Sequence, residues 1–299
     1  MFDFRYHVAS LAAVFLALVI GILVGVGISS GGFVSKSERN ILNGKIDELE
    51  SQLDTARVKT GDLSRTQRAA TTYVEESYPS MMADRLASHR VALVFVGPVD
   101  QRVRDLVERT LVDAGAGTTL RLRAIRVPID VDALDSMLDG RPALVRYARQ
   151  DAARELGRRL AQELVRGGKA PVWRLLATQL VEERAGNEER AADGVVIARS
   201  VPAQQGATAR LLRGFYEGLA SAGVPAVAVE TSQTTPTTVD GFDKANLSTV
   251  DFVDTSVGRF ALSLLLAGAR PGSYGLKPAA TDGALPPVEP VVVPTSPER

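Results

Sequence analysis

Few residues of this sequence are of the types that bind copper or zinc, and three of them lie in one short segment. Met81 and Met82 are adjacent, and His89 follows them. Thioether sulfur and imidazole nitrogen both ligate these metals, so the three side chains are candidate metal ligands. Core packing is the alternative for the methionine pair, and a lone histidine is usually not a ligand. Because the sequence contains no cysteine, it has no thiolate metal site, disulfide or cysteine nucleophile.

Two stretches that follow predicted strands occupy places where α/β folds commonly bind ligands. The first, GPVD at 97–100, lacks the GxGxxG and GxxxxGK(S/T) phosphate-binding motifs. The second, RSVP at 199–202, is not the G-x-S-x-G of a nucleophile elbow. His7 and His89 are the only histidines, so a Ser-His-Asp triad would depend on His89. We therefore predict a binding or assembly domain without enzymatic activity, whereas a ligand at either turn would favour an anchored enzyme.

Composition and charge exclude some classes of function. The chain has 299 residues, of which 45% are hydrophobic, so it can bury a core and form one or two domains beyond a membrane anchor. Its 35 basic and 35 acidic residues give a formal net charge of zero. Nucleic-acid-binding proteins usually carry a basic excess, so we predict no nucleic-acid partner.

An uncharged apolar run at 8–34 dominates the N-terminal part of the chain. At about 1.5 Å per residue, roughly 20 apolar residues cross the hydrocarbon core of a bilayer, so this run is long enough to span it. A single spanning segment satisfies its backbone hydrogen bonds only as a helix. We therefore predict a single-pass membrane anchor at 1–34. A cleaved signal peptide is the alternative, although its apolar core is usually shorter, at roughly 7–15 residues.

Small residues recur at every fourth position of the anchor and form one ridge: Ala9, Ala13, Ala17, Gly21, Gly25 and Ser29. Small residues at this spacing let two membrane helices approach closely, and Gly21 and Gly25 form a GxxxG pair. We predict that Ala13, Ala17, Gly21 and Gly25 form a helix–helix packing face. The alternative is that alanine and glycine are simply common in membrane helices.

A polar segment at 35–89 follows the anchor. Its residues Leu42, Ile46, Leu49 and Leu53 are spaced in alternating steps of four and three, the a/d seam of a coiled coil. We predict a short parallel coiled coil made by the same homo-oligomer as the anchor. The alternative is one amphipathic helix lying on the soluble body. A helix break is expected near Pro79, because proline drives the preceding residue toward an extended conformation.

The soluble body at 90–272 alternates strand and helix patterns. Buried strands are expected at the short apolar runs 91–96, 194–198 and 226–230. Alternating apolar and arginine residues at 119–127 predict a half-exposed edge strand. Helices are expected at 101–114, 130–140, 143–167, 173–183, 207–222 and 256–269. The fold class is therefore α/β: a three-layer domain with a mainly parallel sheet of at least four strands.

Two segments beyond these strands are expected to lack regular structure. Residues 184–193 are polar and are expected to form a loop. Residues 273–299 are rich in proline, which predicts a disordered and extended tail.

Two parts of the sequence carry a resemblance to a known family. The first is FRYHVASLAAVFLAL at 4–18, which continues with GILVG at 21–25. The second is STVDFVD at 248–254, followed by Gly258-Arg259, Ala261-Leu262 and GSYG at 272–275. These segments, and the order of anchor, coil and α/β body, resemble the mycobacterial copper-transport protein B (MctB) family of actinobacterial envelope proteins.

The resemblance implies a role in copper transport or tolerance, a channel or pore activity in the envelope, and a body outside the cytoplasmic membrane. Copper would then be a transported ion, and no bound cofactor is expected. By themselves, Arg5 before the anchor and Lys36, Arg39 and Lys45 after it favour a cytoplasmic body. The expected partners are the lipid bilayer and further copies of the chain. The alternative function is a scaffold, dimerised by its coiled coil, that recruits envelope partners without handling metal.

Overall fold

The computed structural model of the protein describes residues 4–30, 36–147 and 152–288. The chain divides into two compact units, residues 1–70 and 71–299. The boundaries predicted from the sequence lie after residues 34, 89 and 272. The second unit begins earlier than residue 90 because Tyr78, Met82 and Leu86 already belong to its apolar core.

Helix α1 (Phe4–Ser30) contains the predicted membrane span. Its residues Tyr6–Gly27 are long and apolar enough to cross a bilayer, and their side chains are exposed. A helix that is apolar on all sides fits a lipid environment, where its backbone groups are satisfied internally. The N-terminal apolar helix predicted from the sequence is therefore present.

Helix α2 (Lys36–Met82) runs without interruption through Pro79, so the predicted break there is wrong. Proline removes one backbone donor from a helix. Because α2 ends within one turn of Pro79, only one backbone hydrogen bond is missing, and it lies close to the end of the helix. The Pro79 carbonyl still accepts from the Ala83 N–H at 3.0 Å.

The second unit is built on a seven-stranded sheet in the order β3-β2-β1-β4-β5-β6-β7. Its strands are β1 (Val91–Val96), β2 (Arg121–Ile125), β3 (Val181–Gly186), β4 (Gly194–Arg199), β5 (Ala226–Val229), β6 (Ser248–Val250) and β7 (Ser273–Tyr274). All neighbouring strands are parallel except β2 and β3. The loops that follow β1, β4, β5 and β6 therefore share one edge, the carboxyl edge of the sheet.

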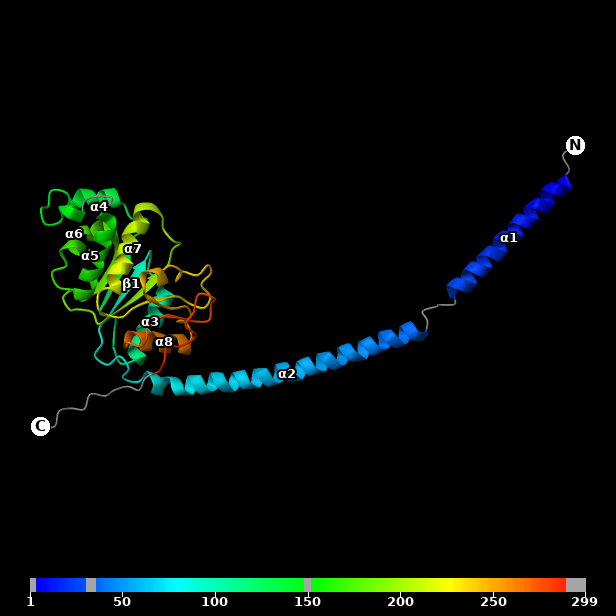
Figure 1. Ribbon diagram of the computed structural model, residues 1–299, viewed down its shortest axis with the longest axis horizontal. Coiled ribbons are helices and arrows are strands. Elements are labelled where there is room, and N and C mark those ends of the chain that lie inside the picture. Colours follow the sequence, from blue (N-terminus) through cyan, green and yellow to red (C-terminus); the bar gives the residue numbers. More distant parts are fainter. Residues whose placement is uncertain (1–3, 31–35, 148–151, 289–299) are drawn as a thin grey trace. The chain divides into compact units, whose positions relative to one another are not determined.

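Helices cover both faces of this sheet (Figure 1). One face carries α4 (Val131–Leu138), α5 (Ala153–Arg166), α6 (Pro171–Leu180) and α7 (Gly206–Ala220), and the other carries α3 (Gln101–Asp113) and α8 (Ser256–Leu266). Alternate strand residues point to opposite faces, so Val94 packs with the first set and Leu93 and Phe95 with the second. The fold is the predicted three-layer α/β domain with a mainly parallel sheet.

The helix predicted at 143–167 is divided. A short 3-10 turn, η1 (Val145–Tyr147), precedes α5, and residues 148–151 lie outside the described residues. At other helix starts, side chains cap the free backbone donors. Asp100 accepts from the Val103 N–H of α3 at 3.1 Å, and Thr255 accepts from the Gly258 N–H of α8 at 3.0 Å.

The prediction of an edge strand at 119–127 is wrong, as is the prediction of a loop throughout 184–193. β3 pairs with the outer side of β2. Both arginines of β2 are buried: Arg121 donates to the Leu164 carbonyl at 2.9 Å, and Arg123 donates to Glu188 at 2.8 Å. These partners offset part of the cost of burying a cation, so a strand with alternating arginines lies inside the sheet.

The predicted disordered tail begins too early. β7 pairs with β6, and the structure describes the chain as far as residue 288. Tyr274 is buried and donates its hydroxyl to the Arg270 carbonyl at 3.0 Å. The segment that follows β7 is therefore part of the body, while residues 289–299 lie outside the described residues.

Candidate functional site

Two turns close on each other at the carboxyl edge, where the strand order reverses between β1 and β4. Such a reversal is the usual ligand-binding place of an open α/β sheet. Gly97 adopts φ +100°, and a Cβ there would lie 2.7 Å from both Ser200 Oγ and Val201 Cγ1. The Ser200 hydroxyl donates to the Pro98 carbonyl at 2.6 Å. The two turns singled out in the sequence therefore pack against each other, and the Ser200 proton is bound to the backbone. A cavity of about 500 Å³ lies beside them and is lined by Asp100, Ser200 and Glu230.

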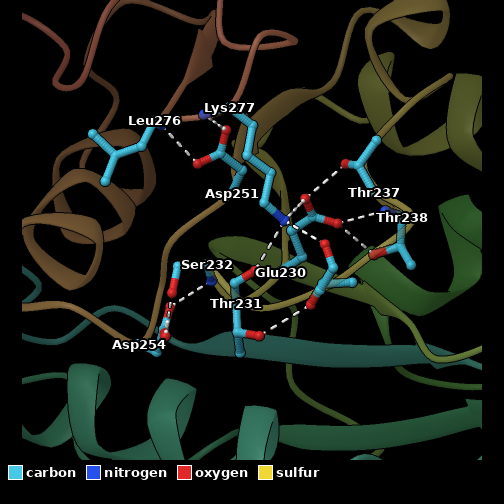
Figure 2. Close-up of polar contacts among 10 residues, drawn as sticks. Glu230, Thr231, Ser232, Thr237, Thr238, Asp251, Asp254, Leu276 and Lys277 are labelled. Atoms are coloured by element: carbon cyan, nitrogen blue, oxygen red, sulfur yellow. Dashed lines mark hydrogen bonds and ion pairs between the residues drawn. The ribbon is translucent and has the colours of Figure 1, made fainter. Parts of the chain in front are cut away.

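Carboxylates lie farther along the same edge, after β5 and β6 (Figure 2). Glu230 directly follows β5 and is almost fully buried, and its Oε1 lies 2.6 Å from Lys277 Nζ. The hydroxyls of Thr237 and Thr238 donate to its two carboxylate oxygens at 2.7 and 2.8 Å. Lys277 Nζ also donates to the Thr234 carbonyl at 2.8 Å. The ion pair is thus enclosed by further hydrogen bonds.

The balance of these contacts sets the protonation of Glu230. Burial alone would raise the pKa of Glu230, because it penalises the charged form. Hydrogen bonds from Lys277, Thr237 and Thr238 stabilise the carboxylate more strongly, so the pKa lies below its ordinary value of 4.5. Glu230 is therefore a carboxylate at neutral pH, and it ties the loop after β5 to the segment after β7.

Asp251, directly after β6, fixes the same C-terminal segment. Its Oδ1 and Oδ2 accept from the backbone N–H groups of Leu276 and Lys277, both at 2.9 Å. A Cβ at Gly275 would overlap this carboxylate, so only glycine fits there without displacing it. A buried carboxylate that accepts two backbone hydrogen bonds is a strong anchor for a loop.

Asp254 fixes the loop after β5 in the same way. Its two oxygens accept from the backbone N–H and the hydroxyl of Ser232, both at 2.7 Å. Burial alone would raise the pKa of Asp254, but the hydrogen bonds from Ser232 outweigh it and the pKa is lowered. We call Glu230, Asp251, Asp254 and Lys277 the carboxylate lock.

The carboxylate lock is suited to holding loops rather than to holding a metal ion. Its carboxylates already accept from ammonium, hydroxyl and backbone donors of the protein. In the part of the chain that the structure describes, no group of three or more His, Cys, Asp or Glu residues is placed to hold a metal ion. The arrangement therefore joins the loops after β5, β6 and β7 into one assembly at the carboxyl edge.

Comparison with known proteins shows the family. The family model described as "Copper transport outer membrane protein, MctB" matches residues 1–285. The chain belongs to the MctB family. The copper transporters MctB of Mycobacterium bovis and Mycobacterium tuberculosis are each 44% identical to it over 61 residues. That match covers 20% of this chain and only 19% of each of these relatives.

MctB is a family named for copper transport and for the outer membrane, not for a class of enzyme. Among the described residues, α1 is the one helix long and apolar enough to cross a membrane, and it fits an anchor that crosses once. Ala13, Ala17, Gly21 and Gly25 all lie on α1 and are exposed, and a Cβ at either glycine would meet nothing within 4 Å. Helix–helix packing through this face stays a prediction.

The carboxylate lock contains much of the second segment by which the sequence resembles the MctB family. Asp251 and Asp254 come from STVDFVD, and Gly275 of GSYG receives the Asp251 carboxylate. Arg259 of the same segment lies over the Tyr78 ring, with its Cζ 4.7 Å from the ring centroid. In this MctB-family chain, these residues build the body by fixing its loops and the end of α2.

The coiled-coil candidates of this MctB-family chain all lie on α2. Leu42, Ile46, Leu49 and Leu53 have exposed fractions between 47% and 63%. Because α2 is continuous, their spacing forms one apolar stripe along the helix. Association of two copies through this stripe stays a prediction.

The metal-ligand candidates have different surroundings. Met82 is fully buried in the same core as Tyr78 and Leu86, whereas Met81 is partly buried against that core. His89 Nδ1 lies 3.3 Å from the Ala87 carbonyl oxygen. Packing accounts for Met82, and a metal-binding role for Met81, Met82 and His89 stays a prediction.

Sequence reasoning missed Glu230 and Lys277. The sequence did contain a signal for Glu230, because the apolar run at 226–230 ends in this acidic residue. The segment at 248–251 likewise ends in an acidic residue, Asp251. A charge placed directly after a buried strand needs partners. Lys277 gave no such signal. It lies within residues 273–299, which were predicted to be a disordered tail because they are rich in proline.

Proposed function

We propose that the chain is a membrane-anchored envelope protein that acts in copper transport and copper tolerance, with its body outside the cytoplasmic membrane. The observation that carries this proposal is the extent of the family match, from the anchor to the end of the body at residue 285. The curated relatives, named copper transporters, support it over a shorter stretch. Copper is the transported ion, not a resident cofactor.

We propose further that copper moves through an assembly and not through one copy. A single apolar helix such as α1 cannot enclose a hydrated path, because a spanning structure must be a helix bundle or a closed barrel to do so. The body offers a carboxylate lock whose oxygens are already bound to protein donors. A pore or channel therefore requires several copies of α1 or a partner protein.

The exposed stripe on α2 supports a parallel dimer as the unit of this assembly. Ile46 and Leu53 occupy a positions, and Leu42 and Leu49 occupy d positions. A β-branched residue at a with leucine at d favours two parallel strands. Helix packing through Gly21 and Gly25 would join the same two copies in the membrane.

The test measures cell copper in a deletion strain grown with added copper, with and without the full-length gene. We expect the deletion to raise cell copper and complementation to restore it. A double variant, Ile46→Asp with Leu49→Asp, places two charges in the stripe and should fail to restore it. The matched control is Ile41→Asp with Val58→Asp, which adds the same charges at exposed apolar positions of α2 outside the stripe.

The outcomes separate the parts of the proposal. Unchanged copper in the deletion strain would refute the copper role. Restoration by the stripe variant, at equal membrane levels, would refute dimerisation through α2 and leave the copper role standing.

A scaffold is the second candidate function, favoured by the same exposed stripe. In this case the dimer would recruit envelope partners without handling metal. Unchanged cell copper, together with loss of cross-linked dimers in the stripe variant but not in the control, would support the scaffold.

A further inference from the structure

A cavity of about 550 Å³ lies in the body between α7 and the loop that contains η3 (Asp243–Ala245). It is separate from the carboxylate lock, although Arg199 at the end of β4 lines both this cavity and the one beside Glu230. Its volume falls within the range of about 300–1,000 Å³ that is typical of small-molecule sites. Its position near the carboxyl end of β4 is where open α/β sheets bind ligands.

The charges around this cavity are predominantly positive. Four cationic residues line it against two acidic ones, which gives a net charge of +2: Arg154, Arg199, Arg213 and Lys244 against Glu217 and Asp240. One acidic group is already neutralised by arginine. Glu217 accepts from Arg154 Nε at 2.8 Å and from Arg158 Nη2 at 2.8 Å, and these hydrogen bonds lower the pKa of Glu217.

Arg199 lines the cavity and is held in position by an aromatic ring. Its Nε is buried and has no hydrogen-bond partner among the described residues. Its guanidinium lies over the Phe242 ring, with Cζ 5.7 Å from the centroid, which orients the charged group. The charge of Arg199 therefore belongs to the lining of the cavity, and packing on Phe242 fixes the plane of its guanidinium.

The remaining walls are apolar and aromatic. Tyr216 lines the cavity and packs on Phe242, with ring centroids 4.7 Å apart, and Leu212 and Ala245 complete this side. The lining therefore combines apolar and aromatic side chains with cations.

We propose that this cavity binds a small organic phosphate monoester that carries a flat ring. A phosphate monoester has a charge of about −1.5 to −2 at neutral pH, which matches the net +2 of the lining. The planar guanidinium of Arg199 suits two phosphate oxygens at once, and Arg213 adds a second cation at the exposed side. This activity is independent of copper transport.

The test uses the full-length protein in dodecyl maltoside and titrates it by calorimetry with AMP, phenyl phosphate, adenosine and inorganic phosphate. We expect AMP and phenyl phosphate to bind. AMP should bind at least about tenfold tighter than adenosine, which lacks the phosphate group, or inorganic phosphate, which lacks the ring. Arg199→Gln should weaken AMP binding by about tenfold or more, and Arg213→Gln by a smaller factor. Arg166→Gln, an exposed arginine of α5 outside the cavity, should leave the affinity unchanged.

Several results would overturn the proposal. Absence of binding by both phosphates would do so, as would equal affinity for AMP and adenosine. Binding that survives Arg199→Gln in a folded protein would place the ligand elsewhere. If Arg199→Gln does not fold, the exposed Arg213→Gln decides, because it should fold and still bind more weakly than Arg166→Gln.

Discussion

The carboxylate lock and the arginine-lined cavity lie on one body, and both have charged groups near the carboxyl edge of its sheet. In the lock, Glu230 and Lys277 face each other at 2.6 Å, and hydroxyl and carbonyl groups bind the remaining donors and acceptors. In the cavity, Arg199 has a buried Nε with no partner among the described residues. The lock matches its charges within the chain, whereas Arg199 of the cavity forms no ion pair with the described residues.

The difference separates structural charges from charges kept for binding. A buried ion pair contributes little net stability over an apolar pair, but breaking it leaves an uncompensated charge and is strongly destabilising. An unmatched cation has the opposite property, since removing it relieves a desolvation cost that nothing offsets. The two regions should therefore respond differently to removal of one charge.

The largest effect is expected for Lys277→Met. This change leaves Glu230 buried without its counter-ion, and we expect a loss of about 3–5 kcal/mol in the free energy of unfolding. Urea unfolding of the full-length protein in detergent measures it. Trp173, the only tryptophan, is buried in the body and reports its unfolding by fluorescence. Lys169→Met, at an exposed position of the same body, is the control and should change stability little. Equal small losses for both variants would show that the lock is not structural.

A smaller loss is expected for Gly275→Ala. The added Cβ would overlap the Asp251 carboxylate and displace it from the Leu276 and Lys277 N–H groups. Leaving a buried acceptor or donor unsatisfied costs about 1–3 kcal/mol, which should appear in the same urea experiment. Gly44→Ala in α2, where a Cβ meets nothing within 4 Å, should not change unfolding of the body. If the Gly275→Ala protein were as stable as the parent, the hydrogen bonds from Leu276 and Lys277 to Asp251 would not contribute to stability.

The sheet was largely predictable from the sequence, and the failures have a physical cause. Val91–Val96 and Ala226–Val229 are continuous apolar runs, the pattern of strands buried on both faces. The strand β3 was missed because VEERAG at 181–186 has no apolar pattern, and its pairing with β2 is made by the backbone. The arginines of β2 suggested exposure, but their partners Leu164 and Glu188 come from distant parts of the chain.

The candidate site was less predictable than the fold. The turns at Gly97 and Ser200 follow from strand ends, which periodicity reveals. The pair of Glu230 with Lys277 joins residues far apart in sequence, and the proline content of the tail concealed it. The cavity depends on Arg199, Tyr216 and Phe242, which come together only through tertiary packing.

The pH dependence of stability tests the carboxylates of the lock, and Glu217 of the cavity acts in the same direction because its pKa is also lowered. The pKa of Glu230 is lowered in the folded state, so its contribution is present above the ordinary value of 4.5 and is lost as the pH falls through the folded-state pKa. Asp254 acts in the same direction below its ordinary value of 3.8. We expect the free energy of unfolding to fall with acidification below about pH 4.5, and Glu230→Gln to flatten that fall. An unchanged slope in Glu230→Gln would assign the acid sensitivity to other carboxylates.

The smallest effect is expected for Arg199→Gln in the ligand-free protein. The substitution loses the contact with Phe242, which is worth about 0.5–1 kcal/mol, but it also removes a partly buried cation whose Nε has no partner within the described part of the chain. These terms oppose each other, so the free energy of unfolding should change by less than about 1 kcal/mol in either direction. The urea experiment that measures Lys277→Met measures this change as well. A loss as large as that of Lys277→Met would make Arg199 a structural residue and would remove the argument that its charge is kept for a ligand. Near-neutral stability combined with loss of AMP binding would instead show that the same edge of the sheet uses one set of charges to fix its loops and another to bind.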